Sequence, residues 1–112
     1  MPRTAIPVTQ IVRAGIAKPI IMAGDATNDH SIASNNGRLF LEIKNTDATI
    51  RGLIIQTPLV TDNLALADLS VGVPAGETWM VGPFSTQTFN QTDESIWVDL
   101  TEATWEFRVF KL

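Results

Sequence analysis

The chain contains no cysteine, which excludes disulfides, thiolate zinc sites and cysteine nucleophiles. Its single histidine, His30, excludes metal cages built from several histidines and leaves one possible base for a serine triad. Cations are also few, because 8 Lys and Arg stand against 12 Asp and Glu, for a formal net charge of -4. Binding to a phosphate backbone depends on clustered cations, so we expect no nucleic-acid partner.

Long apolar runs are absent as well. A helix that spans a bilayer needs about 20 consecutive apolar residues, and a signal peptide needs an apolar core near the N-terminus. The sequence has neither, so we expect no membrane partner and synthesis in a cytoplasm. With 112 residues, of which 45% are hydrophobic, the chain predicts one globular domain.

What is present is a series of short runs rich in Val, Ile, Thr, Trp and Phe, separated by Gly, Pro, Asn and Asp. Such spacing is typical of an all-β sandwich or barrel. Helical periodicity is almost missing, and we expect at most a turn or two of helix, near residues 61–68. The predicted strands are Val8–Val12, Pro19–Ala23, Leu39–Lys44, Ile50–Thr57, Leu69–Val73, Glu77–Val81, Ser95–Leu100 and Trp105–Lys111.

Three of these runs alternate between apolar and polar residues, as strands with one buried face do. The residues predicted to face the core are Leu39, Leu41, Ile43, Ile96, Val98, Leu100, Trp105, Phe107 and Val109. The run 50–57 is apolar on both faces, which predicts a central strand covered on both sides. The prediction is an antiparallel β-sandwich of seven or eight strands, immunoglobulin-like or jelly-roll in type.

The polar segment from Asp25 to His30 has two interpretations. Asp25, Asn28, Asp29 and His30 carry groups that bind calcium or transition metals. The same residue types form ordinary turns, in which Asx side chains accept hydrogen bonds from their own backbone. Because the segment lacks the acidic spacing of an EF-hand loop, we expect a turn, with no metal and no cofactor.

No motif predicts an enzyme. The sequence has no Gly-x-Ser-x-Gly elbow and no glycine-rich phosphate loop after a strand. Neighbouring acids such as Asp93 and Glu94 are expected to lie on the solvated surface, because twelve acids produce such pairs by chance. We therefore predict no catalytic residue.

All three tryptophans fall on predicted strands. Trp79 and Trp105 are expected in the core, whereas Trp97 shares its face with Ser95 and Asp99. Trp97 is therefore expected either at a protein–protein contact or under a loop. Aromatic rings on a sheet face also stack on sugars, so a carbohydrate-binding module for host attachment remains an alternative.

Residues 1–23 are rich in proline, and three cations but no acid precede Asp25. We expect this segment to form an N-terminal arm that docks on a neighbouring subunit, while residues 24–112 form the sandwich. The expected partner contacts are Ile6, Val8, Ile11, Arg13 and Trp97. The alternative is that residues 8–12 are the first strand of the sandwich.

Several segments resemble small structural proteins of tailed bacteriophages. These are the segment from Asn35 to Thr46, the turn Val73–Thr78, the segments Val81–Phe84 and Phe89–Asp93, and the ending Phe110–Leu112. The resemblance implies a virion component, most simply a capsid decoration (cement) protein on the capsid surface, with a neck or tail protein as the alternative. It further implies the major capsid protein as partner and a homo-oligomer as the working form, and it carries no catalytic residue.

Overall fold

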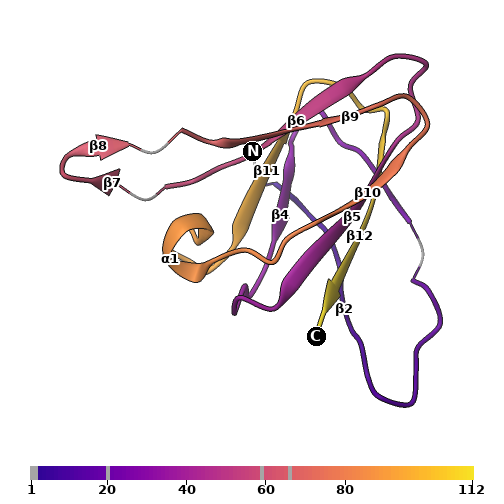
Figure 1. Cartoon of the computed structure of the whole chain (residues 1–112), viewed down its shortest axis with the longest axis horizontal. Coiled ribbons are helices and arrows are strands. Elements are labelled where there is room, and N and C mark those ends of the chain that lie inside the picture. Colours follow the sequence, from indigo (N-terminus) through magenta and orange to yellow (C-terminus); the bar gives the residue numbers. More distant parts are fainter. Residues whose placement is uncertain (1–2, 20, 59, 66) are drawn as a thin grey trace.

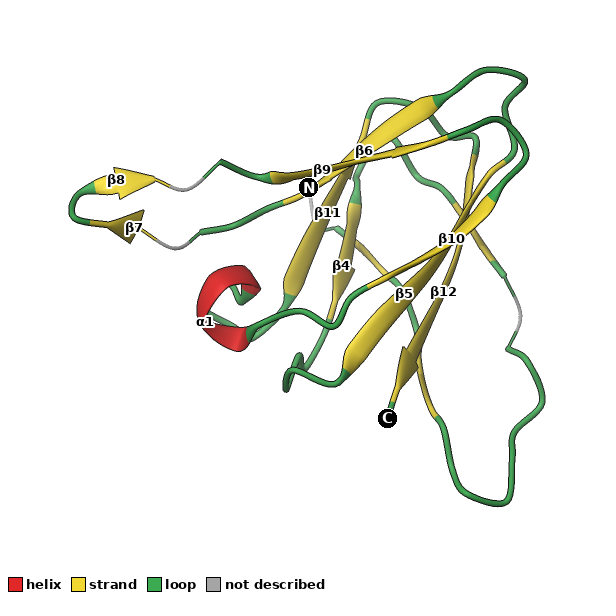
Figure 2. Cartoon of the chain, in the orientation of Figure 1, coloured by secondary structure: helices red, strands yellow, loops and turns green. Residues whose placement is uncertain are grey.

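The computed structural model of the chain is a β-sandwich with one short helix (Figures 1 and 2). It describes all residues except 1–2, 20, 59 and 66. The side chains of residues 60, 61 and 65 are also not described. The elements are β1 (Thr4–Ala5), β2 (Val8–Gln10), β3 (Met22–Ala23), β4 (His30–Ile32), β5 (Leu39–Asn45), β6 (Arg51–Ile55), β7 (Val60–Thr61), β8 (Leu64–Ala65), β9 (Leu69–Val73), β10 (Thr78–Val81), α1 (Thr86–Phe89), β11 (Ile96–Leu100) and β12 (Trp105–Lys111).

Two five-stranded sheets face each other. Sheet A has the strand order β1-β4-β11-β6-β9, and sheet B has the order β10-β5-β12-β2, with β3 also paired to β12. The sandwich is thus confirmed, with ten strands in place of the seven or eight expected. All eight predicted runs contain a strand, and the two unexpected sandwich strands are the short β1 and β4.

The strand pairs are antiparallel with two exceptions, both made by the N-terminal segment. β1 runs parallel to β4 in sheet A, and β2 runs parallel to β12 in sheet B. Between these two strands the chain crosses from one sheet to the other at Ile6 and Pro7. Residues 4–10 therefore belong to the sandwich. For β2 this agrees with the alternative interpretation, in which residues 8–12 form a strand of the sandwich.

The core lies between the sheets and is formed by the residues that alternation predicted. Leu39, Leu41 and Ile43 of β5 face Ile96, Val98 and Leu100 of β11, and all of them are buried. Trp105, Phe107 and Val109 of β12 complete the inner face of sheet B. Burying so many large apolar side chains, at about 1.5–3 kcal/mol each, stabilises the fold.

One face of β6 departs from expectation. Leu53 and Ile55 are buried in the core, but Ile54 between them is exposed to solvent. β6 lies between β11 and β9, and Ile54 on its outer face is 41% exposed. The prediction that this strand is covered on both sides is therefore wrong, because apolar residues on both faces do not by themselves require two covers.

The segment expected to contain helix forms a hairpin instead. β7 and β8 pair antiparallel and project from the sandwich beyond β6 and β9 (Figure 1). The two residues between them, Asp62 and Asn63, both have positive φ, at 54° and 64°, which is typical of a type I′ turn. The one helix of the described chain is α1, which precedes β11. No helix in the described part of the chain has the length and apolar character needed to span a membrane.

Candidate functional site

The outer face of sheet A carries a polar cluster around Trp97. Trp97 and Asp99 alternate with the buried residues of β11, so both side chains point away from the core. Trp97 pairs with Ser31 of β4, and Asp99 pairs with Ile54 of β6. We define the Arg3 cluster as Arg3, Gln56, Gln91, Trp97 and Asp99.

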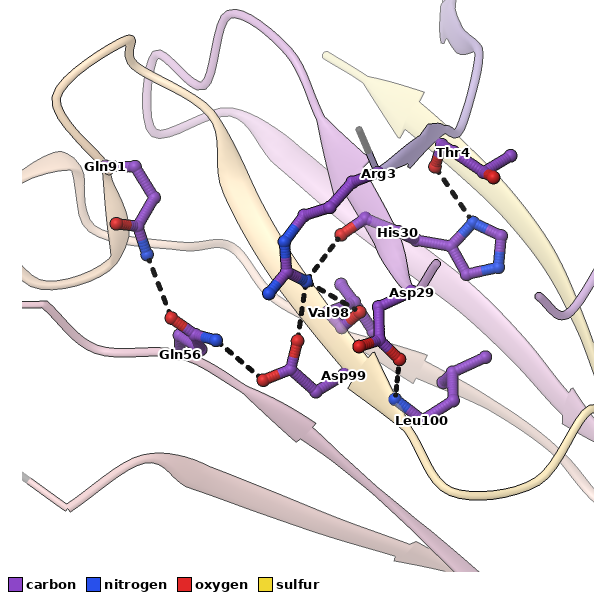
Figure 3. Close-up of polar contacts among 9 residues, drawn as sticks. All are labelled: Arg3, Thr4, Asp29, His30, Gln56, Gln91, Val98, Asp99 and Leu100. Carbon is purple, nitrogen blue, oxygen red and sulfur yellow. Dashed lines mark hydrogen bonds and ion pairs between the residues drawn. The ribbon is translucent and has the colours of Figure 1, made fainter. Parts of the chain in front are cut away.

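Arg3 connects the N-terminal segment to this face (Figure 3). Its guanidinium carbon lies 4.3 Å from the centre of a Trp97 ring, which is a cation–π contact. Its Nη1 donates to the Asp99 carboxylate at 2.5 Å and lies within hydrogen-bond distance of the carbonyl oxygens of His30 and Val98. The guanidinium therefore covers one face of the indole and neutralises the neighbouring carboxylate.

The remaining oxygen of Asp99 is also occupied. Gln56 Nε2 donates to Asp99 Oδ2 at 2.6 Å, and Gln91 Nε2 donates in turn to Gln56 Oε1 at 3.4 Å (Figure 3). The cluster contains no hydroxyl or amine beside a base, so its geometry provides no activated nucleophile. Its chemistry suits binding and structural roles.

The segment 25–30 forms the turn that the sequence predicted. The Asp25 carboxylate accepts hydrogen bonds from the hydroxyl of Thr4 at 2.6 Å and from the backbone N–H groups of Thr27 and Asn28 at 3.0 and 3.1 Å. The bond from Thr4, followed by those from Asn28, lowers the pKa of Asp25 to about 2. The described residues contain no group of three His, Cys, Asp or Glu side chains that could hold a metal ion.

His30 is fully buried and joins this turn to β1. Its Nε2 accepts the backbone N–H of Asp25 at 2.9 Å, so the proton of the neutral ring sits on Nδ1, which donates to the Thr4 carbonyl at 3.0 Å. The ring also contacts Phe107 edge-on, with 5.0 Å between centroids. Burial lowers the pKa of His30 despite the opposing effects of the Thr4 carbonyl, Asp25 and Asp29, and the Arg3 charge lowers it further.

We expect the folding stability to decrease as the pH falls below about 6.5, the ordinary pKa of histidine. Because the pKa of His30 is lowered in the folded state, the unfolded chain binds the proton more readily and acid favours unfolding. The Asp25 carboxylate adds to this loss only at lower pH, between about 3.8 and 2. Urea unfolding curves between neutral pH and pH 5 measure the effect.

The matched control for this prediction is His30→Gln. The amide oxygen of glutamine can accept from the Asp25 N–H and its NH₂ group can donate to the Thr4 carbonyl, but the side chain does not titrate. The variant should therefore show a flatter stability profile between pH 7 and 5. An unchanged slope in this variant would show that another group causes the loss.

The five expected contact residues do not share one surface. Ile6 is only 3% exposed and sits in the core, while Trp97 lies half-buried under Arg3 on sheet A. Val8 is exposed on β2 at the edge of sheet B. Ile11 and Arg13 belong to the following loop, where Arg13 is exposed. The fold therefore does not bring these residues together, and Ile6 is used by its own chain.

The tryptophans divide differently from the prediction. Trp105 is buried as expected, but Trp79 is 40% exposed, because it lies on β10 at the margin of sheet B and not within the core. Sequence reasoning also missed Arg3 as the residue that covers Trp97. Trp97 and Asp99 are two residues apart, so the alternation of the strand predicted that they share the outer face. No local pattern indicates that Arg3, 94 positions earlier, contacts that face.

A second surface feature is an apolar groove at the end of β10. It has a volume of about 380 Å³ and is formed mainly by Phe40, Met80, Val81, Pro83 and Leu112. Met80 and Leu112 are strongly exposed.

In comparisons with known proteins, no family model, no curated protein and no solved structure matched this chain.

Proposed function

We propose that this protein is a non-catalytic virion component of a tailed phage, a decoration protein that binds the major capsid protein on the surface of the assembled head. The observation that carries the proposal is where the exposed apolar residues lie. Several of them lie on loops, on the projecting hairpin and on edge strands, such as Val12, Ile16, Leu64 and Met80. The resemblance of residues 35–46, 73–78, 81–84 and 89–93 to small phage structural proteins supports the same role.

The loop between β2 and β3, of which residues 11–19 and 21 are described, is the part of the N-terminal arm left for docking. Val12 and Ile16 are exposed on it, and Arg13 has no acidic partner among the described residues. The base of the loop is held to sheet B, because Arg108 donates to the Pro19 carbonyl at 2.8 Å and Lys18 pairs with Glu42 at 3.3 Å. A tethered loop with an exposed cation suits an acidic patch on the shell.

The test is binding of the purified protein to expanded heads that lack it, measured by co-sedimentation and by location in an electron-microscopy map. We expect saturable binding on the shell surface and a higher temperature of shell disruption, because a ligand that prefers the assembled shell stabilises it. Arg13→Glu should weaken binding by about fivefold, from loss of one exposed ion pair and gain of a repulsion.

Arg38→Glu is the matched control, because Arg38 is also an exposed arginine but lies before β5 and does not belong to the loop. Equal effects of the two changes would show that only net charge matters, and would remove the loop from the contact. Density at the neck or tail in place of the head would favour the alternative location. Absence of binding to any part of the particle would overturn the proposal.

A glycan-binding role is the second candidate, favoured by one observation. Trp97, Asp99, Gln56 and Gln91 together place an indole, a carboxylate and two amides on one open sheet face, and such groups bind sugars. A sugar that stacked on the covered face of Trp97 would have to displace Arg3. Saturable fluorescence quenching by a host polysaccharide that is lost in Trp97→Ala would support this role, and no response would favour the capsid role.

A further inference from the structure

β10 ends sheet B, and among the described strands its one neighbour is β5. Its four residues, Thr78–Val81, include no charge and no proline, and none of them is buried. Exposed edge strands of natural proteins usually carry lysine, proline or a bulge that prevents pairing with another chain. β10 carries no lysine and no proline, and a bulge lies just before it, where Gly76 and Glu77 stand opposite Asn45, so the edge of Thr78–Val81 still offers a strand-pairing surface (Figure 2).

The pairing with β5 determines which backbone groups of β10 are free. The Asn45 N–H donates to the Glu77 carbonyl at 3.1 Å, and the Asn45 carbonyl accepts from the Gly76 N–H at 2.9 Å, so the Glu77 carbonyl points toward β5. Antiparallel ladders alternate, so Trp79 and Val81 also direct their N–H and C=O groups toward β5. Thr78 and Met80 then direct theirs outward, away from the sheet.

We propose that β10 pairs antiparallel with β10 of a second copy of this chain, about a two-fold axis that passes beside Trp79. In this register Thr78 of each copy lies opposite Met80 of the other, so the outward N–H and C=O groups form four hydrogen bonds. The two Trp79 residues become a non-hydrogen-bonded pair, in which opposite Cα atoms approach to about 4.5 Å. This inference does not depend on the proposed function, because the dimer forms in the absence of a shell.

Charge and side-chain character favour a second copy as the occupant. Glu77 is the one charged residue from Val73 to Val81, and the two-fold axis places it opposite Val81 of the other copy and not opposite a second glutamate. Each chain carries a net charge of -4, so an uncharged margin is a favourable place for two copies to meet. The pair also covers Trp79 and Met80, which are 40% and 57% exposed.

Another register is less compatible with the structure. Pairing centred on Met80 would place Thr78 opposite Gly82, where φ is +131° and the chain leaves the strand conformation. The register centred on Trp79 uses only residues 77–81. It also brings the partner's turn at Gly76 toward the apolar groove formed by Met80, Val81 and Pro83.

The test is the molecular mass of the full chain in solution across the micromolar range, by light scattering and sedimentation equilibrium. We expect a monomer–dimer equilibrium. Trp79→Lys should weaken the dimer roughly a hundredfold, because it removes an aromatic pair and sets two like charges directly opposite each other. Trp79→Glu should do the same, and circular dichroism of both variants checks that the fold persists.

An equimolar mixture of the Trp79→Lys and Trp79→Glu variants should restore a dimer, since residue 79 then faces a charge of opposite sign. Leu69→Lys is the matched control, because Leu69 is comparably exposed on β9, the uncharged margin of sheet A, and its replacement should leave the dimer intact. A wild-type chain that stays monomeric would overturn the proposal and would leave β10 to a strand of another protein. Failure of the mixture to pair, or dissociation by Leu69→Lys, would also overturn it.

Discussion

Replacing Ile6 by alanine is expected to lower the free energy of unfolding by about 2–4 kcal/mol, the usual cost of truncating a buried isoleucine. Ile6 is 3% exposed and belongs to the core cluster between the two sheets. Its backbone N–H donates to the Ser31 carbonyl at 2.9 Å, which holds it at the crossing between β1 and β2. Urea unfolding measures the change.

Val8→Ala is the control for this prediction, because Val8 lies two residues further on but is 37% exposed. That change should cost less than about 1 kcal/mol, as surface substitutions usually do. Similar losses for the two variants would contradict the burial of Ile6. The same reasoning predicts that deletion of residues 1–7 destabilises the fold severely, so such a truncation cannot test docking of the arm.

The second large effect is expected from Arg108→Ala. Glu42 is 7% exposed although it lies on the outer face of sheet B, and Arg108 Nη1 donates to its Oε1 at 3.0 Å. Removing a partner from a buried ion pair costs about 3–5 kcal/mol, because the remaining charge is left buried and unpaired. We expect about 2–3 kcal/mol here, since Lys18 still lies 3.3 Å from the same oxygen.

Lys18→Ala removes the other partner of Glu42 and serves as the control. The Lys18 side chain is 63% exposed, so its pair with Glu42 should contribute less than about 1 kcal/mol. In the double variant Arg108→Ala with Glu42→Gln, the loss should be smaller than in Arg108→Ala alone, because no buried charge then remains. A double variant less stable than Arg108→Ala would contradict this account.

The sandwich could be predicted from sequence because its long strands carry their pattern locally. In β5, β11 and β12 three alternate residues of each strand are apolar, and all nine are buried. β1 and β4 could not be found in this way, because two or three residues are too few to establish a period. The hairpin at Asp62 and Asn63 was missed for the same reason, because β7 and β8 have only two residues each.

The candidate site was less predictable, because it depends on contacts between distant segments. The position of Trp97 outside the core followed from its polar neighbours, but its cover by Arg3 depends on β1 joining sheet A beside β4. Trp79 was expected in the core because tryptophan is usually buried. It is exposed because the order of strands places β10 at the margin of sheet B. No run of neighbouring residues encodes that order.

The position of β12 also determines when this protein can fold. β12 holds the middle of sheet B, with β5 on one side and β2 and β3 on the other, so Val8 pairs with Val109 across about a hundred residues of chain. During synthesis β2, β3, β5 and β10 therefore leave the ribosome without the strand that joins them. Folding that depends on such distant pairing is slow, and sheet B can be completed here only after residues 105–111 have emerged. Until then the uncharged strand β10 is exposed on an unfinished sheet, which makes nascent chains the form of this protein most in need of a chaperone.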